Sequence, residues 1–80
     1  MIQVTTHTGK VIDAASLKEA VEIVTSYRDS HGVGAEKFYR HQKVGQIFQD
    51  GKLIGVVSYN GRVWAPNEAG RASTTEVVVG

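Results

Sequence analysis

Histidine, glycine and serine are the residue types in this sequence that could carry chemistry. The three histidines, His7, His31 and His41, lie far apart, and no two have the i, i+4 spacing that places two metal ligands on one helix face. Gly32 and Gly34 lack the lysine of a phosphate-binding loop, and no serine lies in a nucleophile-elbow motif. We therefore expect a non-enzymatic protein that uses no catalytic residue, metal or cofactor.

A short basic run with an aromatic residue inside it is the second chemical pattern. Its members are Lys37, Tyr39, Arg40, His41 and Lys43. Because basic side chains hold phosphates and aromatic rings stack on bases, this run together with Arg62 and Trp64 favours a small nucleic-acid-binding protein as one interpretation. The alternative is an ordinary solvated loop, which a formal net charge of only +1 favours.

Length and composition limit the architecture. A chain of 80 residues can bury one hydrophobic core, so we expect a single domain over residues 1–80, with 66–80 as a loosely ordered tail or an edge strand. The absence of cysteine excludes disulfides and thiolate metal sites. No basic leader opens the chain, and no apolar run approaches the roughly 20 residues of a membrane span. We expect a soluble, cytoplasmic protein.

The first part of the sequence predicts a β-hairpin followed by an amphipathic helix. Residues 2–5 alternate as in a strand, and a turn at residues 7–10 precedes two β-branched residues. Ser16 and Glu19 have the spacing of a capping box, which predicts a helix that starts at Leu17 and ends before Gly32. The apolar stripe of this helix consists of Leu17, Ala20, Val21, Val24 and Tyr27.

The second part predicts a three-stranded antiparallel meander. Asp50-Gly51 and Asn60-Gly61 separate β-rich runs, and both dipeptides suit type I′ turns, whose central residues need positive φ. The expected strands are 44–49, 52–59 and 62–65. Pro66 ends the third strand, and residues 74–79 can add an edge strand. Residues 37–40 could form a strand or a short helical turn, because four residues show no convincing period, and we favour a strand. The predicted fold class is α+β, with one amphipathic helix packed on a mostly antiparallel sheet.

Two-residue turns would fix which side chains share a face of the meander. Gln49 would lie opposite Lys52, and Tyr59 opposite Arg62. The aliphatic face, which should receive the helix, then carries Ile47, Ile54, Val56, Val63 and Ala65. The opposite face carries most of the aromatic area, with Val44, Gln46, Phe48, Leu53, Gly55, Val57, Tyr59, Arg62 and Trp64.

The aromatic face is the predicted contact surface, because rigid aromatic and arginine side chains contribute much of the binding energy at interfaces. We expect Tyr59→Ala or Arg62→Ala to abolish partner binding and to leave the thermal melt nearly unchanged. Under the alternative interpretation, the loop around Tyr39 or the C-terminal segment covers these rings. The proposed partner-binding residues are Phe48, Tyr59, Arg62 and Trp64, with Tyr39, Arg40 and Lys43 beside them.

The order of elements resembles that of small phage-encoded anti-CRISPR inhibitors of the α+β kind. The resemblance covers residues 1 to about 65: an N-terminal β segment, a helix opened by Ala14-Ala15-Ser16-Leu17-Lys18-Glu19-Ala20, and a hairpin ending in Gly61-Arg62-Val63-Trp64. It is a likeness of architecture and transfers no residue roles. It implies an inhibitor that docks on a larger host-defence complex, a CRISPR effector, through surface contacts.

A further interpretation is a structural protein that self-assembles. The β-branched segment Val77-Val78-Val79 could pair with its own copy across a two-fold axis and extend the sheet into a homodimer. The partners considered are therefore a larger protein or ribonucleoprotein complex, nucleic acid, and a second copy of this chain, but not a membrane.

Overall fold

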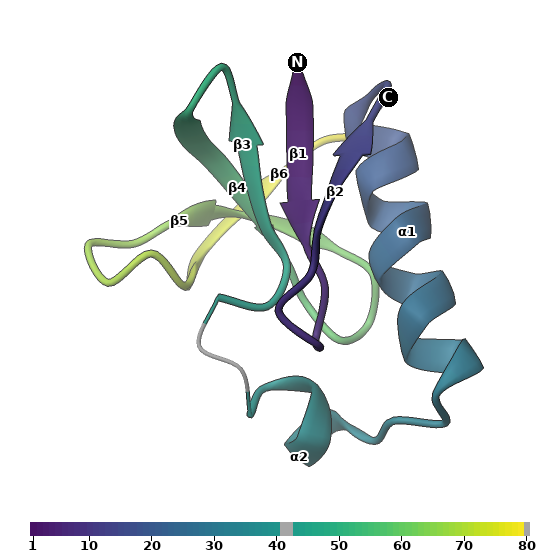
Figure 1. Cartoon of the computed structure of the whole chain (residues 1–80). Coiled ribbons are helices and arrows are strands. Elements are labelled where there is room, and N and C mark those ends of the chain that lie inside the picture. Colours follow the sequence, from purple (N-terminus) through teal and green to yellow (C-terminus); the bar gives the residue numbers. More distant parts are fainter. Residues whose placement is uncertain (41–42, 80) are drawn as a thin grey trace.

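One antiparallel sheet and one long helix make up the fold, shown as a computed structural model in Figure 1. The structure describes residues 1–40 and 43–79. The six strands follow the order β2-β1-β3-β4-β5-β6, and all neighbouring pairs are antiparallel, which confirms the α+β prediction. The elements are β1 (Ile2–Thr5), β2 (Val11–Ala14), α1 (Leu17–Ser30), α2 (Ala35–Phe38), β3 (Gln46–Gln49), β4 (Lys52–Val57), β5 (Val63–Pro66) and β6 (Ala72–Val77).

Helix α1 begins and ends at the predicted residues. The Ser16 hydroxyl accepts a hydrogen bond from the Glu19 N–H at 3.1 Å, and the Glu19 carboxylate accepts one from the Ala15 N–H at 3.1 Å. Gly32, with φ +59°, follows the C-terminal end and adopts the left-handed conformation that stops a helix. The helix lies alongside β1 and β2 (Figure 1). Among the described helices, none is long and apolar enough to cross a membrane.

The strand favoured at residues 37–40 is wrong, because this segment contains the helical turn α2. The Phe38 N–H donates to the Gly34 carbonyl at 3.0 Å, and the Tyr39 N–H donates to the Ala35 carbonyl at 3.1 Å. Phe38 is fully buried in the core. Four residues cannot show a period, so tertiary packing of this one ring, which local sequence does not reveal, decides the conformation.

The two hairpin turns of the meander have different outcomes. Asp50 and Gly51 have φ values of 51° and 82°, and Gln49 pairs with Lys52, which confirms the first turn. The second prediction is wrong: Val57 pairs with Val63, and residues 58–62 form a longer loop. The Ser58 N–H donates to the Arg62 carbonyl at 2.8 Å, and this hydrogen bond closes the loop around three central residues. The longer loop is caused by hydrogen bonds that side chains make within it.

Asn60 explains the longer loop. Its side-chain oxygen accepts hydrogen bonds from the Ser58 hydroxyl and from the Arg62 N–H, the latter at 3.3 Å. Asn60 itself does not have positive φ, whereas Gly61 does, at 82°. This is a type I turn followed by a left-handed glycine, the usual three-residue hairpin. An asparagine that accepts hydrogen bonds from its own turn therefore replaces the expected type I′ geometry.

The changed register moves several side chains to the other face. Val57, rather than Val56, shares the helix-facing side with Val63, and Gly55 now faces Ile47. A second shift, a bulge beside Ile47 and Phe48, displaces the β3–β4 register by one residue. The core cluster is Val4, Ala14, Ala20, Val24, Phe38, Val44, Ile47, Val57 and Val63.

Phe48 and Trp64 still share a face of the sheet, because the two register shifts have opposite effects on their relative orientation. Phe48 pairs with Leu53, and Trp64 pairs with Val56, which in turn pairs with Gln46 on β3. Side chains two residues apart on β3 point to the same face, so Phe48 and Trp64 share the face away from α1, as predicted.

Strands β5 and β6 form a hairpin, so the chain after Pro66 returns as the edge strand Ala72–Val77. The Asn67 N–H donates to the Arg71 carbonyl at 2.8 Å, and Gly70 is left-handed at φ +75°. The Gln46 side-chain amide donates to the Gly70 carbonyl at 2.8 Å, which fastens the hairpin tip to β3. The expected edge strand is thus confirmed as β6 in the same chain.

Strand β6 contains an irregularity. Trp64 pairs with Glu76 and Pro66 with Ala72, so the register shifts between these pairs and β6 bulges. Within the bulge, the Thr75 N–H donates to the Ser73 hydroxyl at 3.2 Å. A local side chain thereby satisfies a backbone donor of this strand.

At Gly45 the chain passes very close to the backbone of Val57. Its N–H donates to the Thr5 carbonyl at 2.6 Å, and its carbonyl accepts from the Val57 N–H at 2.8 Å. Its φ is +76°, and a Cβ atom added to it would lie 2.3 Å from the Val57 carbonyl oxygen. Only glycine fits this position.

A cluster of three rings attaches the β1–β2 turn to the end of α1. The ring centroids of His7 and His31 are 5.0 Å apart, and His31 stacks on Tyr27 at 5.8 Å. The Nδ1 atom of His7 is buried without a hydrogen-bond partner among the described residues. Burial, and secondarily the nearby His31, lower the pKa of His7 below its ordinary value of 6.5. Two further cations, Lys37 and Arg40, line the same hollow as His7.

We expect Gly45→Ala to lower the free energy of unfolding by about 3 kcal/mol or more, because the methyl group meets a backbone carbonyl that cannot move aside. The matched control is Gly51→Ala, where φ is +82° but no atom lies within 4 Å of the added Cβ. Conformational strain alone should cost the control about 1 kcal/mol. Urea unfolding measures both values, and equal losses would contradict the steric argument.

The lowered pKa of His7 predicts acid sensitivity. Since the folded protein binds fewer protons than the unfolded chain, the contribution of His7 to stability is fully present above pH 6.5 and is lost as the pH falls through 6.5 toward the folded pKa. Thermal melts of the native chain and His7→Gln between pH 7.5 and 5 test this. The difference between the two melting temperatures should change across that window; parallel curves would exclude His7 as the cause.

Candidate binding surface

The seven residues expected at the contact surface do not form one patch. Phe48 and Trp64 lie half-buried on the sheet face away from α1. Tyr59 packs toward the core, and Arg62 lies at the start of β5. The other three, Tyr39, Arg40 and Lys43, are exposed between α2 and β3. His41, which belongs to the predicted basic run, lies outside the described residues.

The face that carries Phe48 and Trp64 is partly covered. The β5–β6 hairpin tip lies over it, held by the bond from Gln46 to Gly70. Gln46 and Val56 on this face are consequently buried. The Trp64 ring N–H donates to the Ser58 hydroxyl at 3.1 Å, so its polar edge is already occupied. The open aromatic patch expected from the sequence is therefore reduced to a half-buried strip.

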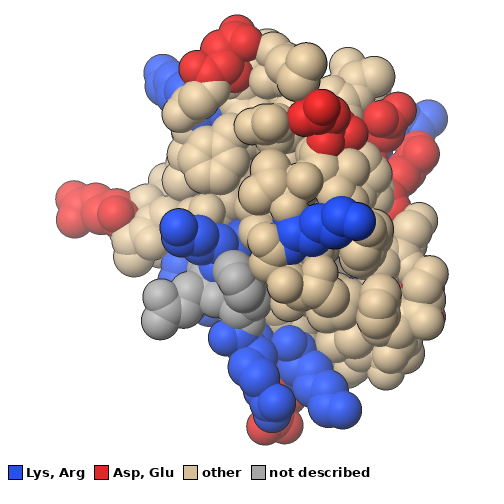
Figure 2. Space-filling model, viewed as in Figure 1, with Lys and Arg blue, Asp and Glu red and all other residues tan. Residues whose placement is uncertain are grey.

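Basic side chains gather on one side of the molecule. Figure 2 shows lysine and arginine concentrated over the centre and the α2 end of this face, with most acidic groups near its margins. Lys37 and Arg40 belong to α2 and the turn after it. Neither Arg40 nor Arg71 has an ion-pair partner among the described residues. The local charge is thus positive although the net charge is only +1.

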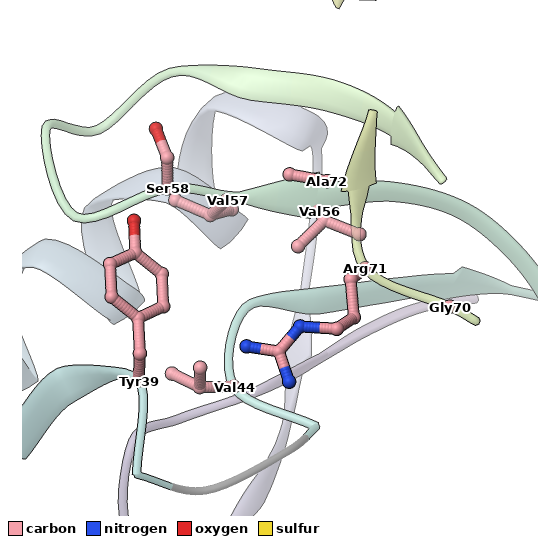
Figure 3. A pocket seen from close by; sticks show the side chains of 8 residues that line it. All are labelled: Tyr39, Val44, Val56, Val57, Ser58, Gly70, Arg71 and Ala72. Carbon is pink, nitrogen blue, oxygen red and sulfur yellow. The ribbon is translucent and has the colours of Figure 1, made fainter. Parts of the chain in front are cut away.

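A hollow of about 320 Å³ opens beside this basic region. Three separate segments line it, from the end of α2 to β3, from β4 and from the β5–β6 tip (Figure 3). Its lining residues are Tyr39, Val44, Val56, Val57, Ser58, Gly70, Arg71 and Ala72. We call it the Tyr39 hollow.

Tyr39 and Arg71 are the two large side chains of the Tyr39 hollow, and in Figure 3 the Tyr39 hydroxyl points toward Ser58 and away from the Arg71 guanidinium. Arg71 extends its guanidinium toward Tyr39 and Val44 in Figure 3. The Tyr39 ring is 41% exposed, yet its position is fixed, because its hydroxyl accepts a hydrogen bond from the Tyr59 N–H at 2.8 Å. The floor consists of valine side chains that belong to or adjoin the core. An exposed ring held rigidly beside a free cation is suited to recognition.

Arg71 is the residue that sequence reasoning missed. The expected edge strand at residues 74–79 leaves Arg71 outside any strand and gives it no role. The pattern from Asn67 to Gly70, an asparagine followed three residues later by glycine, is the same as that of a three-residue hairpin. That signal would have placed Arg71 at the start of a strand beside β5.

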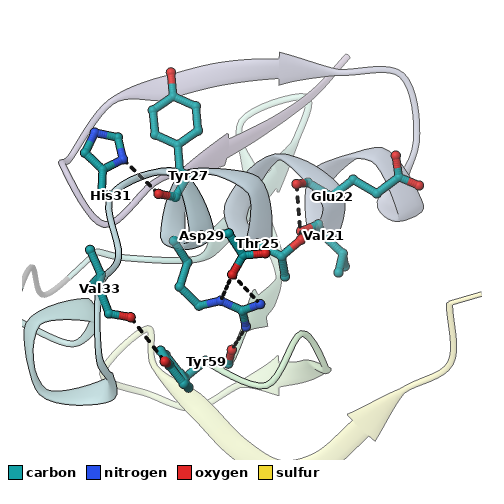
Figure 4. A network of polar contacts seen from close by, with 9 residues as sticks. Val21, Glu22, Thr25, Tyr27, Asp29, His31, Val33 and Tyr59 are labelled. Atoms are coloured by element: carbon teal, nitrogen blue, oxygen red, sulfur yellow. Dashed lines mark hydrogen bonds and ion pairs between the residues drawn. The ribbon is translucent and has the colours of Figure 1, made fainter.

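Tyr59 has a structural role that contradicts its expected position on the aromatic face. Its hydroxyl donates to the Val33 carbonyl at 3.1 Å, as Figure 4 shows. Its ring packs edge-on against Phe38 at 5.5 Å between centroids. The Arg28 guanidinium lies 5.1 Å from the Tyr59 ring centroid and also donates to the Tyr59 carbonyl. Tyr59 therefore connects the β4–β5 loop to α1 and to the segment before α2.

Arg62 is exposed and forms an ion pair. Its guanidinium lies 3.5 Å from the Glu76 carboxylate, and the two side chains are 60% and 47% exposed. Such solvated pairs contribute about 0–1 kcal/mol. Among the described residues, no group of three histidine, aspartate or glutamate side chains could hold a metal ion.

The structure reverses the expected result of alanine substitution at Tyr59. We now expect Tyr59→Ala to lower the free energy of unfolding by about 2–3 kcal/mol through lost ring packing, and Tyr59→Phe by about 1 kcal/mol through the lost hydrogen bond to Val33. Arg62→Ala, the control, should change it by less than about 1 kcal/mol. Chemical unfolding followed by circular dichroism measures all three; a neutral Tyr59→Ala would contradict the packing argument.

Comparison with known proteins adds no family assignment, because no protein-family model, no curated protein and no solved structure matches the chain. The candidate surface is therefore defined by its own geometry: the Tyr39 hollow and the basic residues beside it.

Proposed function

We propose that this chain is a non-enzymatic binding protein whose partner is a larger protein, and that the partner docks on the Tyr39 hollow and the basic residues around it. One observation carries the proposal: an exposed tyrosine ring is fixed beside an apolar floor and an arginine that has no ion-pair partner in the part of the chain that the structure describes. Tyrosine and arginine are enriched among residues that dominate binding energy.

Rigidity supports the choice of this surface over the Phe48–Trp64 strip. The Tyr39 hydroxyl bond and the Gln46 bond to Gly70 fix two walls of the hollow before any partner arrives. Fixed side chains lose little conformational entropy on binding, which favours affinity. The strip offers less, because the hairpin tip covers part of it and the polar edge of Trp64 is occupied.

Nucleic acid is the second candidate, and the basic region of Figure 2 supports it. Single-stranded nucleic acid is usually held by a positive groove with several aromatic platforms. Of the hollow's lining residues that the structure describes, Tyr39 carries the single aromatic ring, and the net charge is +1. These two features favour a protein partner.

The resemblance to anti-CRISPR inhibitors supports a narrower form of the proposal, in which the partner is a CRISPR effector complex. The order of elements is its sole support. In this form the chain acts by occupying a surface of the effector, and no chemistry of its own is required.

The proposal is tested by affinity capture with the tagged chain from a bacterial lysate, before and after nuclease treatment. We expect a nuclease-resistant protein whose recovery falls at least about tenfold with Arg71→Glu, since charge reversal replaces attraction by repulsion at the hollow. Arg62→Gln, also an exposed arginine of the β5–β6 region, is the matched control and should capture normally.

Thermal melts of both variants must match the native chain, so that a lost partner reflects the surface and not the fold. Equal recovery with Arg71→Glu would contradict the proposed surface. Loss of all bound material on nuclease treatment would make nucleic acid the partner.

A further inference from the structure

The hydrogen-bonding state of the Tyr39 hollow points to the chemistry of its ligand. The Ser58 hydroxyl is occupied, because it donates to the Asn60 side chain and accepts from the Trp64 ring N–H. The Tyr39 hydroxyl accepts from the Tyr59 N–H, and its own hydrogen has no acceptor among the described residues. The Arg71 guanidinium also has no acceptor there.

The free side-chain groups of the hollow are therefore donors. Tyr39 offers one O–H, and Arg71 offers the planar fork of N–H groups that matches two oxygens at once. Arg71 is therefore matched by a ligand group that only accepts hydrogen bonds. Carboxylates and phosphates are the common groups of this kind, and charged acceptors make the stronger bonds.

The number of cations separates these two acceptors. Phosphate sites typically gather several arginines or lysines, whereas Arg71 is the single cation among the described residues that line this hollow. The volume, about 320 Å³, is near the lower end of the roughly 300–1,000 Å³ range of small-molecule sites. One or two amino-acid side chains fit such a space better than a chain of nucleotides.

The apolar floor of the hollow favours a ligand that carries an apolar group next to its hydrogen-bond acceptor. Val44, Val56 and Val57 line it below the two donors. An aliphatic side chain over these valines would be removed from water, and its cover would strengthen the bond between Arg71 and the acceptor by lowering the local dielectric.

We propose that the Tyr39 hollow binds an acidic side chain of the partner protein, with its carboxylate on Arg71 and an adjacent aliphatic side chain over the valine floor. This inference is founded on the proposed function and names the part of the partner that is recognised.

The test is a nuclear magnetic resonance titration of the full ¹⁵N-labelled chain with acetyl-Asp-Leu-amide. Saturable shifts are expected at the Arg71 Nε–H and at the backbone amides of Val57, Ser58 and Ala72. Arg71→Gln should weaken binding at least about tenfold, as expected for losing a hydrogen bond to a charged group. Arg62→Gln, whose arginine lies outside the hollow, should bind the peptide as the native chain does.

Two further probes separate the acceptors. Acetyl-Asn-Leu-amide keeps the shape and removes the charge, and equal binding of both peptides would overturn the carboxylate assignment. Inorganic phosphate that shifts the same signals where the aspartyl peptide does not would overturn it in favour of phosphate. If the peptide fails but Arg71→Glu still abolishes capture, the docking surface stands and the carboxylate assignment falls.

Discussion

The passage of the chain through Gly45 is the constraint on which the rest of the structure depends. Its backbone is bonded to β1 on one side and to β4 on the other, at the point where β3 begins. No side chain fits there, so the backbone at Gly45 lies directly against the Val57 carbonyl. The preceding residue, Val44, is thereby held in the core and at the floor of the Tyr39 hollow. The close backbone contact at Gly45 therefore fixes both the register of β3 in the sheet and the position of Val44 at the base of the candidate site.

Two further bonds complete the site from opposite directions. Tyr59 attaches the β4–β5 loop to the segment before α2, and its N–H fixes the hydroxyl of Tyr39. Gln46 holds the tip of the β5–β6 hairpin at Gly70, which places Arg71 across from that ring. The side chains of the hollow come from segments up to about thirty residues apart, so they meet only when the whole sheet has formed. Stability and recognition are coupled in this chain for that reason.

Local signals in the sequence predicted local structure well and long-range placement poorly. The capping residues of α1 and the Asp50-Gly51 turn depend on neighbouring residues alone, and both were predicted correctly. Asn60-Gly61 has a similar pattern, but the side-chain oxygen of Asn60 accepts hydrogen bonds within its turn and lengthens the loop. Because side chains alternate along a strand, this longer loop and the bulge in the β3–β4 pairing together changed the faces assigned to Val56 and Val57.

In the candidate site too, local signals led to correct predictions, whereas positions that depend on long-range contacts were missed. Tyr39 was named from its basic neighbours, whereas Tyr59 was assigned to the wrong surroundings through the register. Arg71 was not named at all, because its position depends on the bond between Gln46 and Gly70, and nothing in the spacing of these residues indicates that contact. The α2 turn was missed since it is stabilised by the burial of Phe38 rather than by a local pattern.

The bulge in β6 has a consequence for how the chain behaves when it is concentrated. An open sheet ends in strands whose outer backbone groups can recruit other chains and begin aggregation. In β6 the register is irregular, and Ser73 occupies the N–H of Thr75. An incoming strand would find the edge bent. The sheet can therefore stay open, without closing into a barrel, and still resist growth into fibrils from this side.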